Sequence, residues 1–76
     1  MNKTALGNLI KLLRTYNNMQ QKELAQALNV TPASVSKWET GINCPDTLTL
    51  EALSNLFHIS INDLYHPEEA IARLER

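Results

Sequence analysis

The sequence predicts a single all-α domain, and three observations lead to this expectation. Leucine and isoleucine residues recur at spacings of three and four, which is the period of one helical face. No stretch alternates polar residues with β-branched or aromatic ones, as a half-buried strand does. Aromatic side chains are few, so an aliphatic core of packed helices is favoured over a sheet sandwich. A chain of 76 residues has room for only one such core.

The first helix is expected to begin at Lys3 or Thr4 and to end at the asparagine pair 17–18. Asn18 suits this end because asparagine tolerates the left-handed conformation in which helices commonly stop. The buried face of this helix is expected to consist of Leu6, Leu9, Ile10 and Leu13.

A second short helix is expected to start at Met19 or Gln20. Its inward-facing residues are Leu24, Ala25 and Leu28. The chain then turns sharply, because Asn29 accepts a positive φ, Thr31 is a good N-cap, and Pro32 suits the first helical position.

The third helix begins only about three residues after the second ends, and it is expected to run to about Thr40. Val35 and Trp38 form its buried pair, and Gly41 supplies its end. Two short helices joined by a tight turn form a helix-turn-helix.

The fourth helix is expected to open at Pro45 and Asp46, and Ser60 is expected to cap a fifth. The apolar stripe of the fourth consists of Leu50, Leu53, Leu56 and Phe57, and the fifth contains Ile61, Leu64 and Tyr65. We therefore expect a five-helix domain over residues 1–66. Residues 67–76 form a C-terminal tail with good helix propensity, either docked as a last helix or frayed.

The charges are unevenly distributed along the chain. The formal net charge of −1 argues by itself against a nucleic-acid partner, since phosphate binding is driven by clustered lysine and arginine. Residues 1–44, however, hold five basic and two acidic side chains, a net charge of +3, whereas residues 45–76 hold two basic and six acidic ones, a net charge of −4. This polarity suits an anionic partner for the first half, or it is a chance asymmetry of two solvated faces.

Other classes of function lack support in the sequence. Cys44 is the only cysteine, and no apolar run is long enough for a signal core or a membrane span, so we expect a cytoplasmic protein without a membrane partner. Cys44, His58, Asp63 and His66 do not have the spacing of metal ligands, so we expect no metal site. Paired carboxylates, a glycine-rich phosphate loop and a nucleophile triad are also missing, so we expect neither an enzyme nor a cofactor.

The segment "QQKELAQALNVTPASVSKWETGINCPDTLTLEALSNLFHISINDLY", residues 20–65, contains a specific series of motifs. They are Gln21-x-x-Leu24-Ala25, a tight turn, Val35-Ser36-Lys37-Trp38-Glu39-x-Gly41, and Pro45. In this order and spacing they resemble the Xre/Cro/CI-type, or lambda-repressor-like, helix-turn-helix family of bacterial and phage transcription regulators. The resemblance implies a five-helix domain whose third helix enters the major groove of double-stranded DNA. It also implies a homodimer that binds a palindromic operator, and we expect a repressor.

By position, the resemblance places the DNA contacts on the third helix and beside it. The residues concerned are Gln21, at a phosphate, and Thr31, Pro32, Ala33, Ser34 and Lys37, at bases or adjacent phosphates. The residue types fit these roles, because lysine can bond to guanine O6 and N7, serine to a base edge or a phosphate, and alanine or proline can touch a thymine methyl. Pro32 and Ala33 replace longer polar side chains, so we expect sparse base readout and a larger share for DNA shape.

The loop of residues 40–44 departs from the family because it carries no lysine or arginine. We therefore expect Thr40, Asn43 and backbone N–H groups to meet phosphates there, with modest affinity and a shallow salt dependence. Arg14 and Glu39 resemble the family's partly buried ion pair between the first helix and the end of the third. Glu39 lies too near the expected DNA to be tolerated without a compensating charge.

Dimerisation is expected on the fifth helix and nearby apolar residues. The candidates are Ile59, Ile61, Leu64 and Tyr65, and for Leu64 the alternative of a place in the monomer's core is favoured. Two alternative functions share the fold. One is an antitoxin or a restriction-modification controller. The other is a protein-interaction domain that does not bind DNA, with a partner at the acidic C-terminal half.

Overall fold

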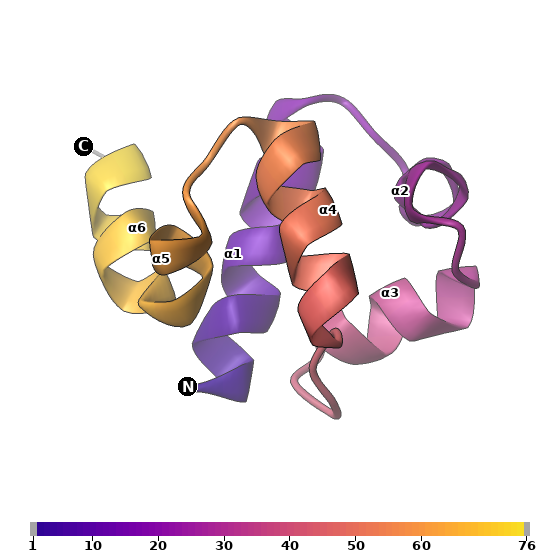
Figure 1. The fold of residues 1–76 in the computed structure, drawn as a ribbon, viewed down its shortest axis with the longest axis horizontal. Coiled ribbons are helices and arrows are strands. Elements are labelled where there is room, and N and C mark those ends of the chain that lie inside the picture. The colour runs from indigo at the N-terminus through magenta and orange to yellow at the C-terminus, as the bar shows by residue number, and fades with distance from the viewer. Residues whose placement is uncertain (1, 76) are drawn as a thin grey trace.

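The computed structural model describes residues 2–75 and confirms the all-α class (Figure 1). Over these residues the chain forms six helices and no strand. They are α1 (Lys3–Tyr16), α2 (Gln21–Leu28), α3 (Pro32–Glu39), α4 (Thr47–Phe57), α5 (Ile61–Tyr65) and α6 (Pro67–Leu74). Five of these helices lie within residues 1–66, as expected, and the tail that begins at Pro67 forms α6, a docked last helix.

The other helices are arranged around α1. It packs against α3, α5 and α6, and in Figure 1 it lies behind α4, with α2 and α3 on one side and α5 and α6 on the other. α2 packs in turn against α3 and α4. The helix-turn-helix formed by α2 and α3 is therefore supported by two other helices, since α1 packs against α3 and α4 packs against α2.

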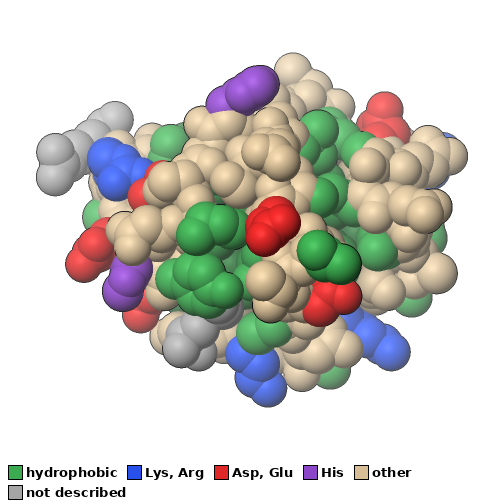
Figure 2. All heavy atoms as spheres, viewed as in Figure 1, with side chains coloured by type: hydrophobic (Ala, Val, Ile, Leu, Met, Phe, Trp, Pro, Cys, Tyr) green, Lys and Arg blue, Asp and Glu red, His purple; other side chains and the backbone are tan. Residues whose placement is uncertain are grey.

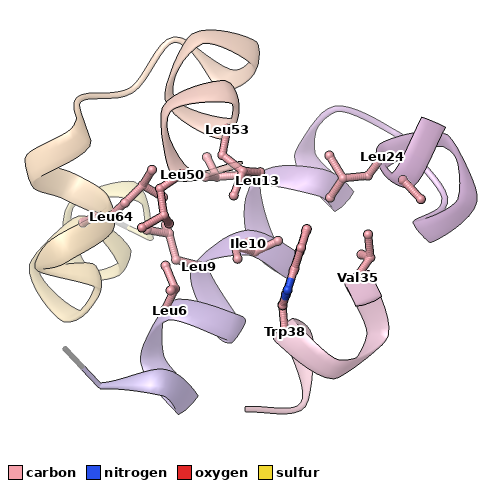
Figure 3. Packing of buried hydrophobic residues seen from close by; sticks show 12 residues of the cluster. Leu6, Leu9, Ile10, Leu13, Leu24, Val35, Trp38, Leu50, Leu53 and Leu64 are labelled. Carbon is pink, nitrogen blue, oxygen red and sulfur yellow. The ribbon is translucent and has the colours of Figure 1, made fainter. Parts of the chain in front are cut away.

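The core is aliphatic apart from Trp38 (Figure 3). Its buried members are Leu6, Leu9, Ile10, Leu13, Leu24, Ala25, Val35, Trp38, Leu50, Leu53, Leu64 and Ala70. Leu28 and Phe57 are only partly buried. Leu56 was expected in the stripe of α4 but is 36% exposed. Each residue turns a helix by about 100°, so Leu50, Leu53 and Phe57 define one face and Leu56 lies on its flank.

Most of the predicted helix ends are confirmed. Asn18 and Asn29 adopt positive φ values of 56° and 57°, and the side chains of Thr31, Asp46 and Ser60 cap α3, α4 and α5. The end of α4 was not predicted: His58 adopts a φ of 55°, and the N–H of Ile59 donates to the carbonyl of Ser54 at 3.1 Å.

α1 and α3 approach each other closely at Gly7. A Cβ atom at this position would overlap the carbonyl oxygen of Trp38 and lie 3.1 Å from the carbonyl oxygen of Glu39. Only glycine leaves room for this contact, and nothing in the helical periodicity of the sequence signals it.

α6 is docked on α1 and α5. Its own residues Pro67 and Ala70 are buried. An ion pair also joins α6 to α5, with Arg73 Nη2 donating to Asp63 Oδ1 at 2.7 Å. The hydrogen bond from Arg73 holds the pKa of Asp63 below its usual value.

We expect Asp63→Asn to be slightly less stable than the wild type near pH 7 and equally stable near pH 2. The pKa of Asp63 is lowered in the folded state, so its charge stabilises the fold at any pH above its usual pKa of about 3.9. This contribution is lost as the pH falls through the lowered pKa. Arg73 is 57% exposed, so the difference near neutral pH stays below about 1 kcal/mol. Thermal melts across this range test the prediction, and a difference that persists in acid would contradict it.

Candidate nucleic-acid interface

The first turn of α3 consists of short side chains at the surface. Thr31 caps the helix, since its Oγ1 accepts a hydrogen bond from the backbone N–H of Ser34 at 3.1 Å. The two hydroxyl groups of Thr31 and Ser34 also lie 3.0 Å apart and share a hydrogen bond. Thr31, Pro32 and Ala33 are exposed, and Ser34 is half-buried. This turn therefore presents a shallow surface of hydroxyl and aliphatic groups.

The opposite side of α3 anchors the helix. Val35 is fully buried and Trp38 lies in the core (Figure 3), as the spacing of these two residues predicted. Lys37 is exposed. Since Val35 and Trp38 bind α3 to the rest of the domain, the lysine and the first turn are the parts of the helix that face outward.

Arg14 and Glu39 lie together at the junction of α1 and α3. Arg14 Nε donates to Glu39 Oε2 at 2.6 Å, and Nη2 donates to Oε1 at 3.0 Å. Only 12% of the arginine side chain and 3% of the glutamate side chain are exposed. The hydrogen bond to Glu39 raises the pKa of Arg14 above its usual value, while burial acts in the opposite direction. Arg14 Nη1 also donates to the carbonyl of Met19 at 2.7 Å, so the guanidinium joins the α1–α2 loop to α3.

Gln21 is the first residue of α2, and its side chain reaches the same ion pair. Its Nε2 donates to Glu39 Oε1 at 3.1 Å. The preceding backbone N–H, of Gln20, is taken by the carboxylate of Glu23 at 2.7 Å. Gln21 is half-buried, so its side chain is held by protein contacts while part of it reaches solvent.

The loop after α3 is exposed but tied to the helix. Thr40 Oγ1 donates to the carbonyl of Ser36 at 2.9 Å, so its hydroxyl hydrogen is already used within the protein. Gly41 has a φ of 77°, and the N–H of Ile42 donates to the carbonyl of Lys37 at 2.9 Å. Asn43 is exposed. The side chain of Asn43 therefore remains available, whereas that of Thr40 is partly committed.

The four residues expected at a dimer interface differ in their exposure. Leu64 is fully buried in the core, Ile59 and Ile61 are half-buried, and Tyr65 is 42% exposed. Leu64 is therefore not at the surface of the monomer. Figure 2 shows hydrophobic side chains next to acidic ones in the middle of one face of the molecule.

A known protein family matches the part of the chain that contains α3 and the helices packed around it. Residues 10–64 match the helix-turn-helix family. The chain belongs to the lambda-repressor-like helix-turn-helix family. This family consists of DNA-binding transcription regulators, and the match covers the helix-turn-helix of this chain.

Two curated relatives of this helix-turn-helix domain are regulators. The HTH-type transcriptional activator BcrR of Enterococcus faecalis is 36% identical over 66 residues, which are 87% of this chain and 32% of BcrR. The HTH-type transcriptional regulator ImmR of Bacillus subtilis (strain 168) is 35% identical over 71 residues, which are 93% of this chain and 56% of ImmR. The chain thus spans 32% and 56% of the lengths of these relatives.

Solved structures share the helix-turn-helix fold. The clp gene regulator ClgR from Corynebacterium glutamicum superposes with a TM-score of 0.76 at 23% identity, over 92% of this chain and 91% of ClgR. The restriction-modification controller C.AhdI from Aeromonas hydrophila superposes with a TM-score of 0.72 at 21% identity, over 80% of this chain and 92% of C.AhdI. HppE, in a crystal structure with cobalt(II) and substrate, superposes with a TM-score of 0.74 at 28% identity, over 84% of this chain and 36% of HppE.

Two features of this helix-turn-helix surface were not predicted from the sequence. The bond between Gln21 and Glu39 joins residues 18 positions apart on different helices, and no spacing rule signals it. Ile42 is 63% exposed just after α3. The sequence shows only that it is an apolar residue directly after the turn glycine Gly41, which does not predict its exposure.

Among residues 2–75, no three histidine, cysteine or acidic side chains are grouped so that they would hold a metal ion. Within the same part of the chain, every helix is too short or too polar to cross a bilayer.

Proposed function

We propose that this domain binds an inverted-repeat operator as a homodimer and represses transcription, with α3 in the major groove of each half-site. The outward face of α3 carries this proposal. It combines an exposed lysine with a first turn of short side chains, on a helix that is anchored by a buried valine and tryptophan.

The size of this face suits a groove. The major groove of B-DNA is about 12 Å wide and admits an α-helix. Pro32, Ala33 and Ser34 are short, so they would let the backbone of α3 approach the base edges closely. In this arrangement Lys37 bonds to guanine, the serine hydroxyl bonds to a base edge or a phosphate, and the methyl and ring groups contact thymine methyls.

The phosphate contacts are assigned to the edges of this face. They are Gln21 and the N-terminus of α2, and also Asn43, Thr40 and the backbone of the 40–44 loop. Because the loop carries no basic side chain, we expect modest affinity with a shallow dependence on salt. The dimer contact is assigned to Tyr65 with Ile59 and Ile61, which are at least partly exposed on or before α5.

Selection of binding sites from a random pool of duplex DNA tests the proposal. Enrichment of an inverted repeat with half-sites about 34 Å apart, bound less tightly as salt rises, would support a dimeric operator-binding protein. Enrichment of a single half-site would argue against the dimer. A reporter gene placed behind the enriched site then tests repression, since an activator would raise its expression.

We expect Lys37→Ala to weaken binding to the selected site by about 10-fold to 100-fold and to relax the preference at one base pair. The reason is that a lysine bonded to guanine contributes to discrimination as well as to attraction. Lys11→Ala is the matched control, because it removes an exposed lysine from α1 instead of α3. If Lys37→Ala weakens all sequences equally, Lys37 contacts a phosphate and does not read a base.

The charge distribution favours one further candidate, a protein-interaction domain that uses this fold without DNA. The second half of the chain carries a net charge of −4, and an acidic surface repels phosphate. A protein that binds no duplex even at low salt would support this candidate over the operator-binding one.

A further inference from the structure

The carboxylate of Glu39 is the point at which three helices meet. It accepts two hydrogen bonds from Arg14 of α1, at 2.6 and 3.0 Å, and one from Gln21 of α2, at 3.1 Å, while Glu39 itself ends α3. Both of its oxygens are therefore occupied, and its side chain is 3% exposed.

The third of these bonds determines the orientation of the Gln21 side chain. An ionised carboxylate only accepts hydrogen bonds, whereas an amide group offers a donor nitrogen and an acceptor oxygen. The nitrogen of Gln21 must therefore face Glu39, and the amide cannot rotate by half a turn without setting its oxygen against the carboxylate. One N–H is used in this contact, and a second N–H of the same nitrogen remains in a defined direction.

The ion pair also sets the charge around this second N–H. An unpaired carboxylate beside DNA would repel a phosphate, but the guanidinium of Arg14 neutralises it at hydrogen-bond distance. Gln21 lies in the first turn of α2, where Gln20 and Glu23 already use their backbone N–H groups in a capping box, so the N–H groups of Gln21 and Lys22 are the ones left to favour an anion. The side-chain donor therefore stands beside backbone donors that favour the same kind of ligand.

We propose that Glu39 is a positioning residue for DNA binding: it holds the amide of Gln21 so that the second N–H donates to an oxygen of the DNA backbone. Glu39 does not touch DNA itself. The inference rests on the proposed DNA-binding function, and it assigns to the ion pair a role in binding as well as in stability.

A double-mutant cycle tests this role with the variants Gln21→Ala, Glu39→Asp and their combination. Aspartate keeps the formal charge but is one methylene shorter, so its carboxylate withdraws from both Arg14 and Gln21 while the net charge that faces DNA is unchanged. Affinity for the selected duplex is measured by fluorescence anisotropy at a temperature where circular dichroism shows each variant folded. We expect Gln21→Ala to weaken binding about tenfold and Glu39→Asp to weaken it several-fold. The double variant should bind no more weakly than Gln21→Ala alone.

Gln26→Ala is the matched control, because Gln26 is exposed on the last turn of α2 and makes no hydrogen bond to Glu39. We expect it to leave affinity unchanged and to show no coupling to Glu39→Asp. If Glu39→Asp and Gln21→Ala weaken binding additively, Glu39 does not act through Gln21 and the inference is wrong. A wild-type protein that binds no duplex overturns the proposed function and this inference together.

A second measurement does not depend on the folding of any variant. The two side-chain amide protons of Gln21 are followed by NMR in the wild-type protein during titration with the duplex. We expect ¹⁵N relaxation to show that this amide is rigid in the free protein, unlike that of the exposed Gln26, and we expect one of its two proton resonances to shift on binding. A Gln21 amide as mobile as that of Gln26 would show that Glu39 does not hold it.

Discussion

Replacing Gly7 with alanine is expected to lower the free energy of unfolding by about 3 kcal/mol. The added Cβ atom would overlap the carbonyl oxygen of Trp38 and crowd that of Glu39. Both obstacles belong to the backbone, so α1 and α3 must move apart and loosen the core between them. The higher helix propensity of alanine offsets at most about 1 kcal/mol of this loss. A core of this size rarely supplies more than about 5 kcal/mol, so much of the protein would be unfolded.

Asn8→Ala is the control for this prediction, since Asn8 is exposed on the same helix. It gains helix propensity without meeting another helix, and we expect it to be neutral or slightly stabilising. Urea unfolding of both variants, followed by circular dichroism, gives the comparison. Equal stability of Gly7→Ala and Asn8→Ala would mean that the two helices do not cross as closely as described.

Arg14→Ala is expected to lower the free energy of unfolding by about 3 to 5 kcal/mol. It removes two hydrogen bonds from the carboxylate of Glu39, whose side chain is 3% exposed, and it also frees the carbonyl of Met19. A buried charge that has lost its partner destabilises the fold more than two apolar side chains in place of the whole pair do. Arg14→Met combined with Glu39→Leu should therefore be closer in stability to the wild type than Arg14→Ala is.

Denaturant unfolding and thermal melts of the single and double variants measure this difference. Lys11→Ala, which removes a positive charge from the same helix but from an exposed position, should change stability by less than about 0.5 kcal/mol. An Arg14→Ala variant as stable as the wild type would mean that water solvates the carboxylate in solution.

The fold was largely predictable because local rules decide most of it. The spacing of Leu6, Leu9, Ile10 and Leu13 identified the buried face of α1, and Asn29, Thr31 and Pro32 identified the turn between α2 and α3. The sixth helix was left open because its short apolar pattern is compatible with docking and with fraying. What decides between them is the surface that α1 and α5 offer, and this surface exists only in the folded chain.

The outward face of α3 was predictable for the same reason, since the burial of Val35 and Trp38 determines which side chains point away. The contacts of Gln21 and Gly7 were not predictable from spacing. Both depend on the distance between helices that are separated in sequence, and this distance is set by packing. The left-handed conformation of His58 was not predictable from the usual rule, because glycine and asparagine are the common residues where a helix ends in this way.

The junction at Glu39 also limits how the domain can be taken apart. A peptide of α2 and α3 alone would carry the whole outward face, yet it would lack the guanidinium that α1 supplies to the carboxylate at the end of α3. The same would hold for a chimera in which these two helices were grafted onto another scaffold. The smallest portable unit for engineering a new specificity therefore includes α1, although no residue assigned to the DNA-contacting face lies on it.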